Sequence, residues 1–160
     1  ALARGLRLVQ LRDNELPADV RESLGREVAA RCRAAGALLV VNEDAALAER
    51  LGADGLHLRE HQLEGLTHRP DFEWVGASCH ARESLDMGAM LGLDYAVLGH
   101  VLPTPSHPDR PAIGWSAFTQ LTRHLPFPVF AIGGLSAAHR LDARAAGAHG
   151  IAAIRGAWMP

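Results

Sequence analysis

The sequence lacks the features that mark several protein classes. It has only two cysteines, Cys32 and Cys79, which is too few for a disulfide framework, so we expect reduced thiols and a cytoplasmic protein. No apolar run reaches the roughly 18 residues needed to cross a bilayer, so we expect no membrane partner. Acidic and basic residues number 18 and 16 and form no basic stripe, which argues against a nucleic-acid partner.

What the sequence does contain is a series of short apolar runs. The chain has 160 residues, 48% of them apolar, enough for one domain with a substantial core over residues 1–160. Successive residues within each run are apolar, a pattern typical of parallel strands that are covered on both faces. The runs span residues 7–13, 37–44, 55–60, 74–80, 95–101, 128–134 and 150–156.

Helical patterns separate these runs. The longest, at 17–36, opens with a proline and acidic residues and ends at a glycine. Strands that alternate with helices predict an α/β fold with a parallel sheet and right-handed crossovers. We expect helices to end at Gly36, Gly52, Gly92 and Gly147, and to be capped at their starts by Asp44, Ser116 and Ser136.

The number and spacing of the strands favour a (β/α)8 TIM barrel over an open doubly wound sheet. Residues 1–10 have the pattern of a helix tail followed by a strand, so we expect the first barrel strand to lie upstream of this chain. The residues after the run at 150–156 leave no room for a last helix. We therefore predict that the chain is a fragment of a longer protein.

Polar residues at the carboxyl ends of the strands are the candidate site residues, because barrel enzymes place function there. His100 closes an apolar strand, and a histidine at such a position can move protons near neutral pH, although a structural histidine is the alternative. Gln10 and Arg12 share one face of a strand and could bind a polar ring or an anion. Further polar candidates at strand ends or in the loop after His100 are Asn42, Glu43, Ser78, Thr104, Ser106 and His107.

Two glycine turns near the end of the chain are candidates for phosphate binding. Gly133 and Gly134 follow one strand, and Gly156 follows the next. Glycine lets an anion approach the backbone closely, and N–H groups at a helix start attract it, although two tight turns would look the same. Asn42 and Glu43 offer oxygen ligands, but two residues are too few to argue for a metal.

Seven segments in order resemble the superfamily of thiamin phosphate synthase and thiazole tautomerase. They are QLRD (10–13), VNED (41–44), GLHLRE (55–60), GASCH (76–80), LGHVLPTPSHP (98–108), AIGGL (131–135) and GIAAI (150–154). The segments ASCH and PTPSHP are most similar to the C-terminal domains of proteins with an N-terminal Nudix hydrolase domain. This resemblance implies a Nudix domain in the same parent chain, and we keep a homodimer as a further expectation.

The resemblance implies a barrel that binds a small-molecule thiazole phosphate. Its phosphate would lie on the turns at Gly133–Gly134 and Ile154–Arg155. The synthase of this superfamily joins the thiazole to a pyrimidine carried on a diphosphate and uses magnesium. Several positions depart from the synthase pattern, which has lysines at Asn14 and His107 and aspartates at Glu43 and Gln62. Because these changes remove positive charge from the diphosphate site, we expect weak or absent synthase activity.

The tautomerase pattern is closer at the strand end that carries Gly99-His100-Val101. The resemblance implies that His100 is the acid/base that aromatises the thiazole, a reaction that needs no metal. We therefore expect an isomerase that binds through Gln10, Arg12, Asn42, Ser78 and the 104–107 loop. Two alternatives stay open: a magnesium-dependent transferase with Glu43 as a metal ligand, and a non-catalytic ligand-sensing domain attached to a Nudix hydrolase.

Overall fold

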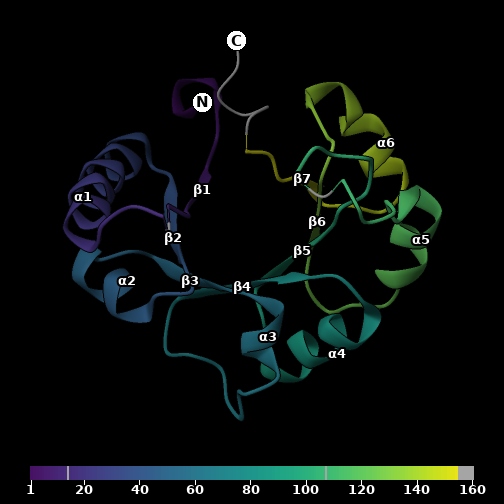
Figure 1. The fold of residues 1–160 in the computed structure, drawn as a ribbon, viewed down its shortest axis with the longest axis horizontal. Helices are drawn as coiled ribbons and strands as arrows, with labels where there is room; N and C mark the ends of the chain where they lie inside the picture. The colour runs from purple at the N-terminus through teal and green to yellow at the C-terminus, as the bar shows by residue number, and fades with distance from the viewer. Residues whose placement is uncertain (14, 107, 155–160) are drawn as a thin grey trace. The chain divides into compact units, whose positions relative to one another are not determined.

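A computed structural model describes residues 1–13, 15–106 and 108–154 of the chain. Strands β1, β2 and β3 pair in parallel, as do β5, β6 and β7, and the strand order follows the chain from β1 to β7. Strands alternate with helices, which confirms the predicted α/β class and the (β/α)8-type pattern (Figure 1). The strands are β1 (Leu8–Leu11), β2 (Leu38–Asn42), β3 (Gly55–Leu58), β4 (Trp74–Cys79), β5 (Tyr95–Gly99), β6 (Val129–Ile132) and β7 (Gly150–Ile151).

The helix boundaries follow local sequence signals. Asp44 caps α2, since its Oδ1 accepts the Leu47 N–H at 2.9 Å, as predicted. Ser116 does not cap a helix, because α5 already begins two residues earlier, at Gly114. The helices are α1 (Ala18–Ala35), α2 (Ala45–Leu51), α3 (Glu60–Leu63), α4 (Arg82–Leu91), α5 (Gly114–Leu121) and α6 (Arg140–Ala145), with 3-10 turns η1 (Leu2–Arg4) and η2 (Ala137–His139).

The chain divides into two compact units. The first unit comprises residues 1–59 and 70–76, and the second comprises residues 60–69 and the described chain from 77 onward. In the first unit, α1 and α2 lie on the same side of β1, β2 and β3 (Figure 1). Gly25 of α1 lets these helices approach closely, since a Cβ there would lie 2.6 Å from a methyl carbon of Leu51. The core that they enclose includes Val9, Leu11, Ala29, Cys32, Leu39, Val41, Leu47 and Leu51.

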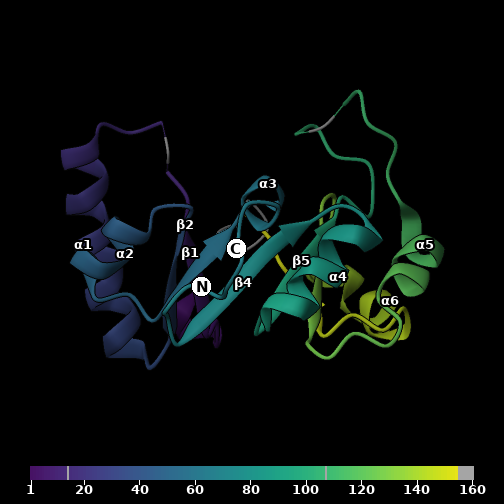
Figure 2. The same cartoon turned by 90° about the horizontal axis from the view of Figure 1, so that it is seen from below.

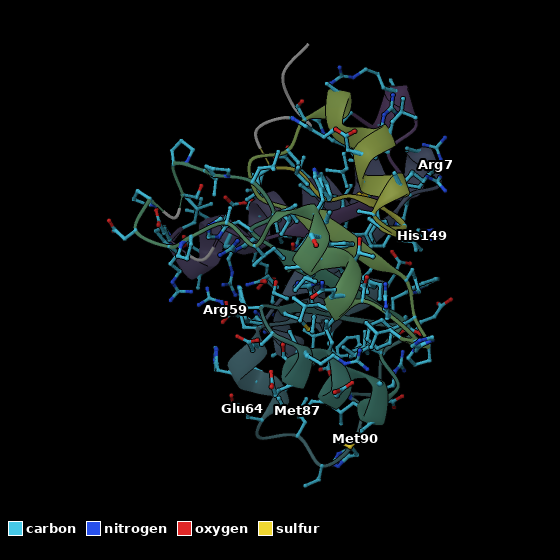
Figure 3. The ribbon with its side chains drawn as sticks, turned by 90° about the vertical axis from the view of Figure 1, so that its right-hand side faces the viewer. Arg7, Arg59, Glu64, Met87, Met90 and His149 are labelled. Atoms are coloured by element: carbon cyan, nitrogen blue, oxygen red, sulfur yellow. The ribbon has the colours of Figure 1, made fainter. Side chains whose placement is uncertain are left out.

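In the second unit, β5 is buried along its whole length. Phe118 of α5 is fully buried, and Thr119 Oγ1 ties α5 to the end of α6 by donating to the Ala146 carbonyl at 2.9 Å. Met90, near the end of α4, is 81% exposed (Figure 3). The chain between β5 and α5 forms a long loop that extends away from α4, α5 and α6 (Figure 2). This loop carries most of the polar residues that the sequence predicted after His100.

A search of the described helices for one long and apolar enough to cross a membrane finds none.

Candidate functional site

In the first unit, the polar side chains at the carboxyl ends of β1, β2 and β3 are joined by hydrogen bonds. Gln10 Nε2 donates to Asn42 Oδ1 at 2.9 Å, and Asn42 Nδ2 donates to Glu43 Oε2 at 2.8 Å. Arg59, which follows β3, places its Nε 2.8 Å from Glu43 Oε1 (Figure 3). Sequence reasoning singled out Gln10, Asn42 and Glu43, and the structure brings them together. It missed Arg59, although this residue also follows a strand end.

His57, on β3, is paired in register with Asn42 and is 1% exposed. Burial lowers the pKa of His57 to about 4, and the positive charge of Arg12 contributes to the same shift. His57 is therefore neutral near neutral pH. Arg12 is close enough for its positive charge to disfavour the protonated form of His57. Arg12 itself is exposed, as is Gln10 two residues earlier.

The described residues do not fit the magnesium ion that the superfamily implies. Both carboxylate oxygens of Glu43 accept hydrogen bonds from neighbouring side chains, and Asn42 Oδ1 accepts one from Gln10. Three or more His, Cys, Asp or Glu side chains that could hold a metal ion do not gather anywhere in residues 1–13, 15–106 and 108–154. A hard divalent cation prefers several free oxygen ligands.

In the second unit, His100 follows β5 directly and is 9% exposed. Its Nε2 lies 3.0 Å from the carbonyl oxygen of Arg110, so this nitrogen carries the proton and donates it to the hydrogen bond. The backbone N–H of Ile113 donates to the His100 carbonyl at 3.0 Å. Side chain and backbone of His100 thus hold the two ends of the loop together.

The Gly133–Gly134 turn packs directly against this loop. Both glycines have positive φ angles, +96° and +69°. A Cβ on Gly133 would lie 2.2 Å from the Cβ of His100, and a Cβ on Gly134 would lie 2.5 Å from the Pro103 carbonyl oxygen. Close backbone approach therefore explains both glycines. The predicted helix start after this turn is a 3-10 turn of three residues followed by the short α6.

The loop after His100 encloses a hollow of about 520 Å3. Thr104 and Arg110 are the polar residues that line this hollow, and the rest of the lining is proline and alanine. The Ser106 N–H lies 3.4 Å from Thr104 Oγ1, which orders the start of the loop. His107 and Arg155, both predicted site residues, fall outside the described residues. Ile154 is 60% exposed, and Ser78 is half-buried within β4.

A Glu–His pair in the second unit was not predicted. His80 Nδ1 lies 2.9 Å from Glu60 Oε2, and the His80 backbone N–H donates to Glu60 Oε1 at 3.0 Å. Burial opposes ionisation of Glu60, but hydrogen bonds from Ser84 and His80 outweigh it and lower the pKa of this carboxyl. His80 directly follows β4 and is a strand-end residue by the same rule as His100, whereas Glu60 stands two residues after β3, as the first residue of α3. Their distance apart in the sequence concealed the pairing.

Comparisons with known proteins agree on one family. The thiamine monophosphate synthase family matches residues 1–157 of the chain. A thiamine-phosphate synthase of Thioalkalivibrio sulfidiphilus is 36% identical over 159 residues, which cover 97% of this chain and 75% of that protein.

A solved structure and a fused relative extend this finding. The thiamine phosphate pyrophosphorylase of Pyrococcus furiosus superposes with a TM-score of 0.80 at 27% identity, covering 96% of this chain and 75% of that one. A bifunctional ThiM/ThiE protein of Symbiobacterium thermophilum is 35% identical over 96% of this chain and 33% of its own length. These matches span nearly the whole sequence, and this chain therefore belongs to the thiamine monophosphate synthase family.

Proposed function

We propose that this chain is a transferase that joins a thiazole phosphate to a pyrimidine carried on a diphosphate. In this reaction the thiazole nitrogen bonds to the methylene carbon of the pyrimidine, the carbon–oxygen bond to the diphosphate breaks, and diphosphate leaves. The family match over residues 1–157, with synthase relatives at 36% identity, carries the proposal. These comparisons favour the transferase alternative over the isomerase that the His100 strand end suggested.

The isomerase interpretation loses its main support at His100. A proton carrier needs a ring nitrogen that can reach the substrate. The Nε2 of His100 already donates to the Arg110 carbonyl. A histidine that holds a loop together in this way does not have to exchange protons, which is the structural alternative that the sequence left open.

Candidate roles in the transferase follow from the chemistry of each group. Gln10 and Asn42 present amide groups that can hydrogen-bond a heteroaromatic ring, with Thr104, Ser106 and His107 as polar loop contacts. Gly133, Gly134, Ile154 and Arg155 are the proposed phosphate contacts, by resemblance. The chain contains no lysine, and all 16 of its basic residues are arginines. Arginine must therefore supply the positive charge that stabilises the leaving diphosphate.

The composition of the parent protein is a separate proposal. A Nudix hydrolase domain in the same chain and a homodimer rest on the resemblance alone. The relative from Symbiobacterium thermophilum is a bifunctional ThiM/ThiE protein, so it supports a fused parent chain in general but not a Nudix domain in particular.

The decisive experiment measures product formation. The protein is incubated with both substrates, and diphosphate and thiamin phosphate are quantified by chromatography. Stoichiometric release of the two products supports the transferase. Conversion of a non-aromatic thiazole substrate without diphosphate release would instead establish an isomerase. Tight binding of thiazole phosphate with no turnover of either kind would leave the ligand-sensing alternative.

A further inference from the structure

We propose that Arg59 occupies the place of a divalent cation in the first unit, and that the diphosphate binds directly to the guanidinium groups of Arg59 and Arg12. This inference rests on the proposed transferase function. It departs from the magnesium dependence that the resemblance to the synthase implies.

The first step concerns the oxygens that a metal would need. Among the described residues that hydrogen-bond to the side chain of Asn42, only Glu43 is acidic. Asp44, the next residue, is paired with Arg21 and caps α2. Arg59 Nε lies 2.8 Å from its Oε1, and Asn42 Nδ2 lies 2.8 Å from its Oε2. Asn42 Oδ1, the other candidate ligand, accepts from Gln10 Nε2 at 2.9 Å. A metal would have to share each of these three oxygens with a hydrogen-bond donor that is already in place.

The second step concerns charge. Arg59 pairs with Glu43, and Arg12 directly follows β1, whose last residue Leu11 is paired in register with Val41 of β2. The neighbouring carboxylate of Asp44 is already paired with Arg21. Arg12 is near enough to His57 for its charge to act on that buried ring. An additional divalent cation would be repelled by both arginines, whereas a diphosphate would be attracted. The balance of charge at this strand end therefore suits an anion and not a cation.

The third step concerns how the diphosphate could enter. The Arg59 side chain is 43% exposed and that of Glu43 is 22% exposed, so their ion pair is open to solvent. Exposed ion pairs are weak, commonly worth about 0–1 kcal/mol. A diphosphate carries more charge than one carboxylate and offers oxygens in the geometry that a guanidinium prefers. Diphosphate can therefore displace the Glu43 carboxylate from Arg59. Glu43 competes with diphosphate for the same guanidinium group.

The test uses inorganic diphosphate as the probe in isothermal titration calorimetry with the whole chain. In EDTA we expect saturable binding to the wild type. Arg59→Gln should weaken this binding at least about tenfold, the value of one charge-assisted hydrogen bond. Glu43→Gln should strengthen it several-fold, because the competing carboxylate is removed. Arg31→Ala, which removes an exposed arginine of α1, is the matched control and should bind like the wild type.

A second titration uses manganese alone, followed by electron paramagnetic resonance. We expect no saturable manganese site in the wild type. Diphosphate binding that disappears in EDTA, or a stoichiometric manganese site that Glu43→Gln abolishes, would overturn the inference. Arg59→Lys keeps the charge but not the position of Nε, and should bind with intermediate affinity. If Arg59→Gln fails to fold and Arg59→Lys folds, the diphosphate affinity of Arg59→Lys compared with that of the wild type tests the role of Arg59.

A turnover assay separates this inference from the proposed function. If diphosphate is released in EDTA when both substrates are supplied, the result supports the transferase function and the role of Arg59. Turnover that requires added magnesium keeps the transferase but refutes the role of Arg59. A chain that binds diphosphate in EDTA through Arg59 yet never joins the substrates refutes the transferase alone.

Discussion

The imidazole Nε2 of His100 lies 3.0 Å from the carbonyl oxygen of Arg110, ten residues further along the chain. Together with the Ile113 N–H on the His100 carbonyl, this contact closes the loop between β5 and α5 at its base. The loop carries Thr104 and Arg110 around its hollow. His100 is thereby a positioning residue for these side chains.

The first prediction separates positioning from proton transfer at His100. His100→Ala should lower the free energy of unfolding by about 2–3 kcal/mol, because it removes a buried ring and its hydrogen bond. His100→Gln should cost about 1 kcal/mol, since its amide nitrogen can still donate to the Arg110 carbonyl. Urea unfolding measures both values.

Activity gives the second readout for the same pair of variants. His100→Gln should retain most of the diphosphate release of the wild type, with the same dependence of kcat on pH. If it is as inactive as His100→Ala, and if the wild-type profile shows one ionisation that both variants lose, His100 carries a proton after all.

A second prediction concerns the close approach at Gly133. Gly133→Ala should destabilise the protein by about 2–4 kcal/mol, because its Cβ would collide with the Cβ of His100 and its φ is positive. Gly147→Ala is the matched control. Its φ of +89° is equally unusual, but no atom lies within 4 Å of the new Cβ. It should cost about 1 kcal/mol in urea unfolding, the backbone term alone. Equal costs for the two variants would show that packing against His100 is unimportant.

A third prediction follows from the buried imidazole of His57. Its pKa in the folded protein is about 4, against an ordinary value of 6.5. The unfolded chain therefore takes up a proton first as the pH falls, which favours unfolding. Above about pH 6.5 His57 has no effect, and towards pH 4 the loss approaches about 3 kcal/mol.

Unfolding midpoints between about pH 7.5 and 4.5 measure this effect before the carboxylates of Glu22 and Glu60, whose pKa values are lowered, begin to lose their own contribution. His57→Gln should flatten the slope over this range. His61→Gln, a substitution of an exposed histidine, should leave it as in the wild type. A wild-type slope in His57→Gln would assign the pH dependence to other groups.

A fourth prediction concerns the two thiols. Cys32 and Cys79 are each 1% exposed, and burial raises the pKa of both, that of Cys79 to about 12. Because the thiolate is the reactive form, neither residue should be alkylated by iodoacetamide near neutral pH in the native protein. Mass spectrometry should find both modified only after denaturation. Rapid native alkylation of Cys79 would contradict this prediction and identify Cys79 as a reactive nucleophile.

Much of the fold could be predicted because apolar runs report strands that are buried on both faces. The segments around Val40 and Val97 are uniformly apolar, and the structure buries them as β2 and β5. Helix ends at Gly36 and Gly52 could be read in the same way, since a left-handed residue is costly for most side chains. Ser116 misled because a hydroxyl residue inside a helix looks like a cap in the sequence.

The candidate site divides along similar lines. The sequence predicted the strand-end positions of Gln10, Asn42 and His100, because a strand end is a local feature. It did not predict which groups these side chains contact. Arg59 pairs with Glu43 across 16 positions, and Glu60 pairs with His80 across 20. No pattern of neighbouring residues encodes such partners.

By itself, the sequence determined the alternation of strands and helices, the family, and the residues offered at the strand ends. These depend on local patterns of burial and on segments that keep their order. Only the tertiary structure decided that Arg59 forms an ion pair with Glu43 and that His100 hydrogen-bonds the Arg110 carbonyl in the loop. The first contact follows from the pairing of β2 with β3, which brings their ends side by side. The second follows from the path of the loop between β5 and α5, which returns Arg110 to His100. Such hydrogen bonds depend on the distance between atoms and not on position in the chain.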